Sequence, residues 1–145
     1  MSDPYEAHRG HIPESYLDIL EKPAFAHIAT ISDAGWPHVS PMWVDHDGDE
    51  AILLNTLRGR RKERNLRANP RSMVSVADPD NPYRYLTVRG QAMLTEDGAD
   101  DHIDALANKY LNADEYPHHD EEAEPRVIVR IPADHVITRG RSADR

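Results

Sequence analysis

Short apolar runs rich in β-branched residues alternate with turn-forming residues along most of the chain. Residues 24–32, 37–46 and 50–57 are three such runs, and their composition is typical of strands. The segments between them, 33–36 and 47–49, are short and contain glycine, which accepts positive φ in a tight turn. The first half of the chain therefore predicts an antiparallel meander of three strands.

The second half of the chain continues this strand pattern. Residues 71–78 and 85–96 predict two more strands, the second with a bulge at Gly90, and residues 79–84 between them predict a proline-bearing loop. Two last short strands are expected within residues 126–140. The pattern predicts about seven strands in total.

Three segments predict short helices instead. Residues 12–22 carry apolar side chains at helical spacing, and residues 60–69 are compatible with a helix that ends before a proline. Residues 97–112 carry an apolar stripe, and Asp97 is placed to cap their start. The expected fold class is mainly β with short helices (α+β), in the form of a small antiparallel barrel with helices on its rim.

Length and composition indicate one domain without metal-thiolate or disulfide chemistry. The chain has 145 residues and no cysteine, so we expect a single domain over 1–145 with a core at about 10–140 and a loose tail at 141–145. The N-terminus has no apolar segment typical of a signal peptide, and no apolar run is long enough for a membrane span. These features predict a soluble, cytoplasmic protein that does not bind membranes.

The charge of the chain is negative and its cations are unusual. The formal net charge is −9, with 26 acidic residues, 14 arginines and three lysines. Repulsion in such a chain is screened at high internal salt, so we expect a salt-adapted, halophilic source. An ordinary acidic protein is the simpler alternative. The negative charge argues against general nucleic-acid binding.

One segment departs from this acidic character. Residues 58–71 hold seven of the 17 basic residues and a single acid, Glu63. The segment follows a predicted strand, contains Gly59 and begins a predicted helix, so it combines close backbone approach with a positive helix end and cationic side chains. This arrangement is suited to the phosphate of a ligand. Two alternatives are a charge cluster paired with the acidic body of the protein and a nucleic-acid patch.

The same segment resembles the cofactor-phosphate segment of the FMN-binding split-barrel superfamily, which includes the pyridoxamine 5′-phosphate oxidases. The shared features are a threonine that ends a strand, Arg-Lys five and six residues later, and then leucine and Asn-Pro; these are Thr56, Arg61, Lys62, Leu66, Asn69 and Pro70. Residues 27–44 are similar to the first hairpin of that superfamily, and residues 83–94 to its long strand. The residues of 109–111 with Tyr116 and Pro117 resemble a motif of its actinobacterial and archaeal branch, the coenzyme F-420-dependent oxidoreductases. The resemblance covers about residues 10–140.

The resemblance implies a split β-barrel, a homodimer with cofactor sites at the interface, and a set of cofactor-binding residues. Arg61 and Lys62 would hold the cofactor phosphate, and Arg58 and Arg60 would reach an acidic tail. The remaining positions lie near the phosphate or the ring, or belong to the branch motif; they are Ser40, Pro41, Met42, Asn55, Thr56, Lys109 and Tyr110. Lys109 also has a simpler interpretation, as an exposed cation at the C-terminal end of a helix.

The function implied is that of an oxidoreductase which moves a hydride between the deazaflavin F-420 and a small unsaturated or carbonyl substrate. The helical Arg and the C-terminal Arg-Leu segment with which pyridoxamine enzymes hold their substrate are missing from this chain, so vitamin B6 oxidation is the weaker interpretation. Within the fold the alternatives are an FMN-dependent oxidase or reductase and a non-catalytic flavin-binding protein. No catalytic residue is assigned, although His27, His38 and Tyr110 have the chemistry of a proton donor.

Two further clusters predict no metal site. Residues 45–50 alternate aspartates, but the positions that a calcium loop needs for glycine and glutamate hold Glu50 and Thr56. Residues 118–124 are rich in histidine and glutamate without a second histidine pair at defined spacing.

Overall fold

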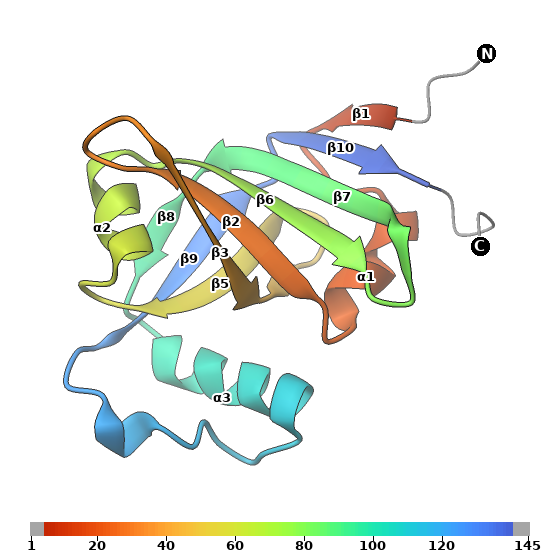
Figure 1. Ribbon diagram of the computed structural model, residues 1–145. Coiled ribbons are helices and arrows are strands. Elements are labelled where there is room, and N and C mark those ends of the chain that lie inside the picture. The colour runs from red at the N-terminus through yellow and green to blue at the C-terminus, as the bar shows by residue number, and fades with distance from the viewer. Residues whose placement is uncertain (1–4, 141–145) are drawn as a thin grey trace.

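The chain forms two antiparallel sheets that enclose one core, with helices around the rim (Figure 1). This computed structural model describes residues 5–140. The larger sheet has the strand order β1 (Tyr5–Arg9), β10 (His135–Arg139), β7 (Asn81–Gln91), β6 (Arg71–Asp78), β2 (Phe25–Ile31) and β3 (Pro37–Trp43). The smaller sheet has the order β4 (Asp45–Asp47), β5 (Ala51–Leu57), β9 (Arg126–Pro132) and β8 (Met93–Thr95). The predicted fold class is confirmed.

The core lies between the two sheets because alternate residues of each strand point inward. On the larger sheet these include Val74 and Val76 of β6 with Leu86 and Val88 of β7, all of which are buried. On the smaller sheet they include the buried residues Ile52, Leu54, Val129 and Ile131. Residues of the opposite parity on the larger sheet face outward.

The helices lie at the predicted places. α1 (Leu17–Glu21) follows a 3-10 turn (Glu14–Tyr16), α2 (Arg61–Ala68) follows β5, and α3 (Ala99–Leu111) follows β8. A second 3-10 turn (His119–Glu121) lies in the long connection before β9. Figure 1 shows α2 at one end of the barrel and α3 below the smaller sheet. No helix within residues 5–140 combines the length and the apolar character needed to cross a bilayer.

The N-terminal cap predicted for α3 is wrong. The helix begins one residue later than expected: its N-cap is Gly98, at φ 75°, and no side chain caps it. The backbone there is left-handed, a conformation that glycine adopts without a steric penalty, so the Asp97 carboxylate does not take the capping position.

The structure has more strands than the pattern predicts. The run 37–46 divides at Val44 into β3 and β4, and the run 85–96 divides at Ala92 into β7 and β8, because each run leaves one sheet and joins the other. β1 was not predicted, since its sequence is polar and its pairing comes from the far end of the chain, where it aligns with β10. Residues 81–84, predicted as loop, extend β7; its Pro82 lies beyond the part of β7 that pairs with β10.

The predicted bulge at Gly90 is also wrong, because Gly90 pairs in regular register with Ser72. The residue is glycine because of a close approach between the sheets: a Cβ at this position would lie 2.3 Å from the carbonyl oxygen of Pro132 in β9. The neighbouring backbone atom cannot move aside as a flexible side chain could.

The Gly90→Ala variant should therefore lose about 2 kcal/mol of unfolding free energy, the range seen when a packed site is overfilled. Chemical denaturation followed by circular dichroism measures this. Substituting alanine for the exposed neighbour Gln91 should change the value by less than about 0.5 kcal/mol. Equal stability of the two variants would contradict the close approach.

Candidate functional site

The strand, turn and helix predicted as a phosphate site form a continuous unit. β5 ends at Leu57, Gly59 turns the chain at φ 92°, and α2 begins at Arg61. Only glycine adopts this backbone conformation readily. The turn therefore places the cationic residues 60–62 at the positive end of a helix.

One carboxylate organises this turn from inside. Glu63 has no exposed surface and accepts hydrogen bonds from the Gly59 N–H at 2.7 Å, from Arg67 Nε at 2.8 Å and from Arg58 Nη1 at 3.2 Å. The hydrogen bonds from Arg67 lower the pKa of Glu63 in spite of its burial. Arg58 also donates to Glu96 at 2.6 Å. Arg58 and Arg67 are thus paired with carboxylates of the same chain.

The other cations of the cluster are not paired. Within the part of the chain that the structure describes, Arg60, Arg61, Lys62 and Arg64 have no carboxylate within salt-bridge distance. The pKa of Lys62 is lowered, first by burial of its ammonium group and then by repulsion from Arg60. An anion bound beside Lys62 would favour the charged ammonium group and so offset both effects on its pKa.

A cleft of about 230 Å³ opens beside this turn. Asn55, Arg60 and Lys62 line it on one side, and Pro41 and Met42 of β3 line it on the other. Five of the eleven predicted cofactor residues therefore meet in one cavity. Its remaining walls come from residues that the sequence did not single out as binding residues: Phe25, Trp43, Ile103, Leu106, Tyr116 and Arg126.

Aromatic rings and one arginine make up much of this unforeseen wall. Tyr116 meets Trp43 edge-on at 6.4 Å between ring centroids, and the Arg126 guanidinium lies 4.7 Å above the Tyr116 ring. Arg126 is almost fully buried and donates through Nε to Glu122 Oε1 at 3.0 Å. The Tyr-Pro motif marked Tyr116 without a role, but no sequence signal connects Arg126 to the cleft.

Two predicted hydroxyl residues do not line the cleft, although each is adjacent in sequence to a residue that does. Thr56 precedes the turn into α2 and is fully buried, and Ser40 precedes Pro41 on β3. Among the described residues, neither Thr56 Oγ1 nor Ser40 Oγ has a hydrogen-bond partner. Buried hydroxyl groups are rarely left unpaired, so both have free capacity for a ligand or an ordered water.

Lys109 and Tyr110 fasten α3 to the strands. Lys109 Nζ donates to the carbonyl oxygens of Val44 at 2.7 Å and Leu20 at 2.5 Å, so the interpretation of Lys109 as an exposed cation is wrong. The Tyr110 hydroxyl accepts from the Val44 N–H at 2.8 Å and donates to the Ala24 carbonyl, and its ring stacks on Trp43 at 5.0 Å. Both side chains thereby hold the strand segment at Val44, next to Trp43 of the cleft wall, without lining the cleft themselves.

The candidate proton donors do not converge on the cleft. Burial raises the pKa of Tyr110 to about 12, and its hydroxyl is occupied by backbone groups. His27 is exposed on β2, and His38 is half-buried on β3. None of the three lines the cavity.

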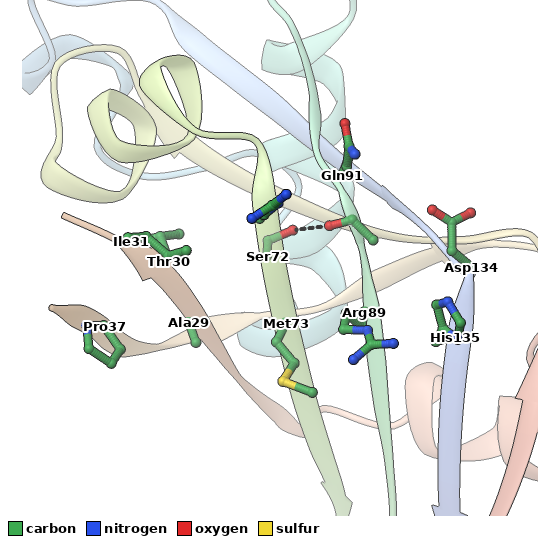
Figure 2. A pocket seen from close by; sticks show the side chains of 12 residues that line it. Ala29, Thr30, Ile31, Pro37, Ser72, Met73, Arg89, Gln91, Asp134 and His135 are labelled. Carbon is green, nitrogen blue, oxygen red and sulfur yellow. Dashed lines mark hydrogen bonds between the residues drawn. The ribbon is translucent and has the colours of Figure 1, made fainter. Parts of the chain in front are cut away.

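A larger hollow of about 550 Å³ lies elsewhere, on the outer side of the larger sheet (Figure 2). Figure 2 shows Met73 and Arg89 on neighbouring strands, with Pro37 and Ala29 to one side and His135 to the other. Ser72 Oγ donates to the Gly90 carbonyl at 3.0 Å within it. The hollow contains none of the predicted cofactor residues. The smaller cleft, which five of them line, is therefore the better candidate for the cofactor site.

Comparison with known proteins identifies the family. The family model described as pyridoxamine 5′-phosphate oxidase matches residues 12–140, whereas no curated protein matches the chain. A solved structure of an F420 reductase has 37% sequence identity and a TM-score of 0.73, and the match covers 86% of this chain and 98% of that one.

Two further structures show the same fold. The conserved hypothetical protein Rv2991 from Mycobacterium tuberculosis is 26% identical with a TM-score of 0.68, over 88% of this chain and 85% of that one. General Stress Protein 26 from Bacillus anthracis is 21% identical with a TM-score of 0.61, over 82% and 87%. With a family match over most of its length and a split-barrel fold, the chain belongs to the pyridoxamine 5′-phosphate oxidase family.

Proposed function

We propose that this protein is an F-420-dependent oxidoreductase, which transfers a hydride between the reduced deazaflavin and a small unsaturated or carbonyl substrate. The observation that carries the proposal is a group of cations at the start of α2, Arg60, Arg61 and Lys62, which have no carboxylate partner within residues 5–140. Arg60 and Lys62 line a cleft with aromatic walls, and the exposed Arg61 lies between them in the sequence. The similarity to a protein named F420 reductase, at 37% identity over nearly all of that protein, supports the choice of cofactor.

The residues fit such a cofactor in separate roles. We assign the phosphate to Arg61 and Lys62 at the start of α2, and the acidic tail to Arg60. Backbone groups at Ser40, Pro41 and Met42 are suited to the polar edge of the ring system. We reassign Arg58 from the tail to the turn itself, because its guanidinium is held by Glu63 and Glu96.

The hydride chemistry belongs to the bound deazaflavin, and the chain supplies binding, orientation and electrostatics. The apolar and aromatic side chains of the cleft exclude water from the ring, while the cations at α2 neutralise the charge of the phosphate. The buried, unpaired hydroxyl of Thr56 is a further hydrogen-bond donor at the end of β5.

We also propose that the active form is a homodimer with the cofactor at the interface. A cavity of about 230 Å³ is below the usual size of a site for a ligand this large, which suggests that one chain supplies only part of it. The outer face of the larger sheet exposes several large apolar side chains, among them Val39 at 60% and Ile137 at 41%, and Trp36 in the turn before β3 is 75% exposed. Such a patch is typical of an interface. Light scattering during gel filtration should give twice the mass of the chain; a monomer would contradict this.

Titration of the purified protein with F-420 and, separately, with FMN tests the choice of cofactor. We expect binding of F-420, followed by oxidation of the reduced cofactor when an enone is added. Tight binding of FMN with no affinity for F-420 would replace our proposal by a flavin oxidase or reductase, which the family match favours as the second candidate. Binding of F-420 without turnover of any enone or carbonyl compound would indicate a non-catalytic carrier.

The lowered pKa of Lys62 gives this proposal a pH dependence. Binding of the phosphate requires a charged ammonium group, so the affinity for F-420 should fall as the pH rises through the lowered pKa, earlier than an ordinary lysine would give. Dissociation constants measured from neutral pH to about pH 10 would show this, since an unperturbed lysine titrates near 10.4. The Lys62→Arg variant stays charged throughout and should lose the dependence. A wild-type affinity that is constant over this range would contradict a charged Lys62 contact.

A further inference from the structure

We propose that His102, held by Asp45 with its proton on Nε2, is a positioning residue that fixes the side chains of Asn55 and Arg126 on the cleft wall. His102 lies on α3 and its side chain is only 9% exposed. It does not line the cleft, whereas Asn55 and Arg126 both do. The effect on the ligand rests on the proposed function; the internal arrangement does not.

The orientation of the Asn55 amide can be determined from its two partners other than the histidine. Its Nδ2 group donates to the Ala99 carbonyl at 2.9 Å, and a carbonyl can only accept. Its Oδ1 lies 3.3 Å from Nη1 of Arg126, and a guanidinium can only donate. The amide nitrogen therefore faces α3, and the amide oxygen faces Arg126.

The protonation of His102 follows from this orientation. Nδ1 of His102 lies 3.1 Å from the Asn55 Nδ2 group, which still has one N–H to donate, so Nδ1 must be the acceptor. The proton of the neutral ring is then on Nε2, which lies 3.1 Å from Asp45 Oδ2. Asp45 is itself held by the His46 N–H at 2.8 Å. Each group thus donates to the next in one direction, from Arg126 at the cleft through Asn55 and His102 to Asp45.

Arg126 is the member of this series of hydrogen bonds that lines the cleft. Glu122 accepts from Nε and Nη2, and Asn55 Oδ1 accepts from Nη1. A guanidinium has five N–H groups, so two remain for an acceptor atom of a ligand. Without His102, Asn55 Nδ2 keeps only the Ala99 carbonyl as a partner on α3. The amide is then held less firmly, and so is the guanidinium of Arg126, for which Asn55 is one of the two residues that accept its hydrogen bonds.

The tautomer can be tested in the ligand-free protein. Nitrogen-15 NMR of the histidine rings should show Nδ1 of His102 as an unprotonated, pyridine-type nitrogen and Nε2 as the protonated one. The opposite assignment, or a doubly protonated ring at neutral pH, would overturn the proposal.

Three variants separate a positioning role from simple packing. His102→Asn keeps an acceptor at the place of Nδ1, His102→Gln keeps a donor toward Asp45 but no acceptor for Asn55, and His102→Leu keeps neither. We expect His102→Asn to bind F-420 within about threefold of wild type. The other two variants should bind about five- to tenfold more weakly, as expected for loss of one neutral hydrogen bond.

A readout without cofactor accompanies the binding data. The Arg126 Nε–H should exchange with solvent faster in His102→Gln than in His102→Asn, because only the second keeps Asn55 in place. If packing alone matters, the Asn and Gln variants will weaken binding equally and exchange at equal rates, which would overturn the proposal. If wild type binds neither F-420 nor FMN, the proposed function fails, while the tautomer and the exchange rates still decide the role of His102.

Discussion

Replacing Arg61 and Lys62 together by alanine should weaken the binding of F-420 by at least about 100-fold. A hydrogen bond to a charged group contributes about 1.5–3 kcal/mol, and each 1.4 kcal/mol is tenfold in affinity, so the loss of two such contacts gives this magnitude. Both residues lack a carboxylate partner within residues 5–140, so their removal breaks no ion pair there. Titration followed by the fluorescence of the deazaflavin measures the change.

The matched control is Arg71→Ala. Arg71 belongs to the same basic segment and is exposed, but it lies at the start of β6, beyond the far end of α2, and lines the other hollow. The Arg71→Ala substitution should reduce the affinity for F-420 by less than about threefold, because it removes only a long-range attraction that salt screens. Equal losses in the control and the double variant would show that the cluster acts by diffuse attraction, and that no phosphate is held at the start of α2.

The Glu63→Gln variant should lose about 3 kcal/mol of unfolding free energy, because it removes the charge of a buried carboxylate from two arginines. Arg67 is half-exposed, which places the loss at the lower end of the range for broken buried pairs. For a chain of this length each kcal/mol corresponds to about 2–4 °C, so the melting temperature should fall by about 6–12 °C.

The pH dependence of this loss follows from the pKa of Glu63. Its pKa is lowered in the folded protein, so the stabilisation is present above the ordinary pKa of a glutamate and disappears as the pH falls through the lowered value. Wild type and variant should therefore converge in acid. Glu96→Gln, at the exposed partner of Arg58, should cost less than about 1 kcal/mol. A melting temperature of Glu63→Gln close to that of wild type would contradict the role of Glu63.

The parts of the site that could be predicted from sequence are those set by local rules. Gly59 and Pro70 bound a turn and a helix by backbone geometry alone, and the charge around Arg61 and Lys62 is visible in the sequence itself. The two hairpins of the predicted meander were predictable for the same reason, because Gly35 and Gly48 mark their turns at positive φ. That they lie in different sheets was not, because the run 37–46 divides at Val44.

What the sequence could not show depends on contacts between distant segments. Arg58 was assigned to a ligand by its charge, yet Glu63 and Glu96 hold it. The acceptors of Lys109 are main-chain oxygens 65 and 89 positions away in the sequence. A pattern of side chains cannot predict contacts to backbone oxygens at such separations. Arg126 reaches the cleft only because β9 pairs with β5. Neither strand's own sequence predicts which strand will be its neighbour in the sheet.

The pairing of β1 with β10 has a consequence for how the chain is made. β1 begins at residue 5 and its partner ends at residue 139, and the smaller sheet likewise needs β9, which begins only at residue 126. During synthesis β1 therefore leaves the ribosome long before its partner β10 has been made. β5 likewise leaves the ribosome long before β9 has been made. Neither sheet can be completed before these late strands have been made, so the edges of β1 and β5 that pair with them stay unpaired during most of the synthesis of residues 5–139.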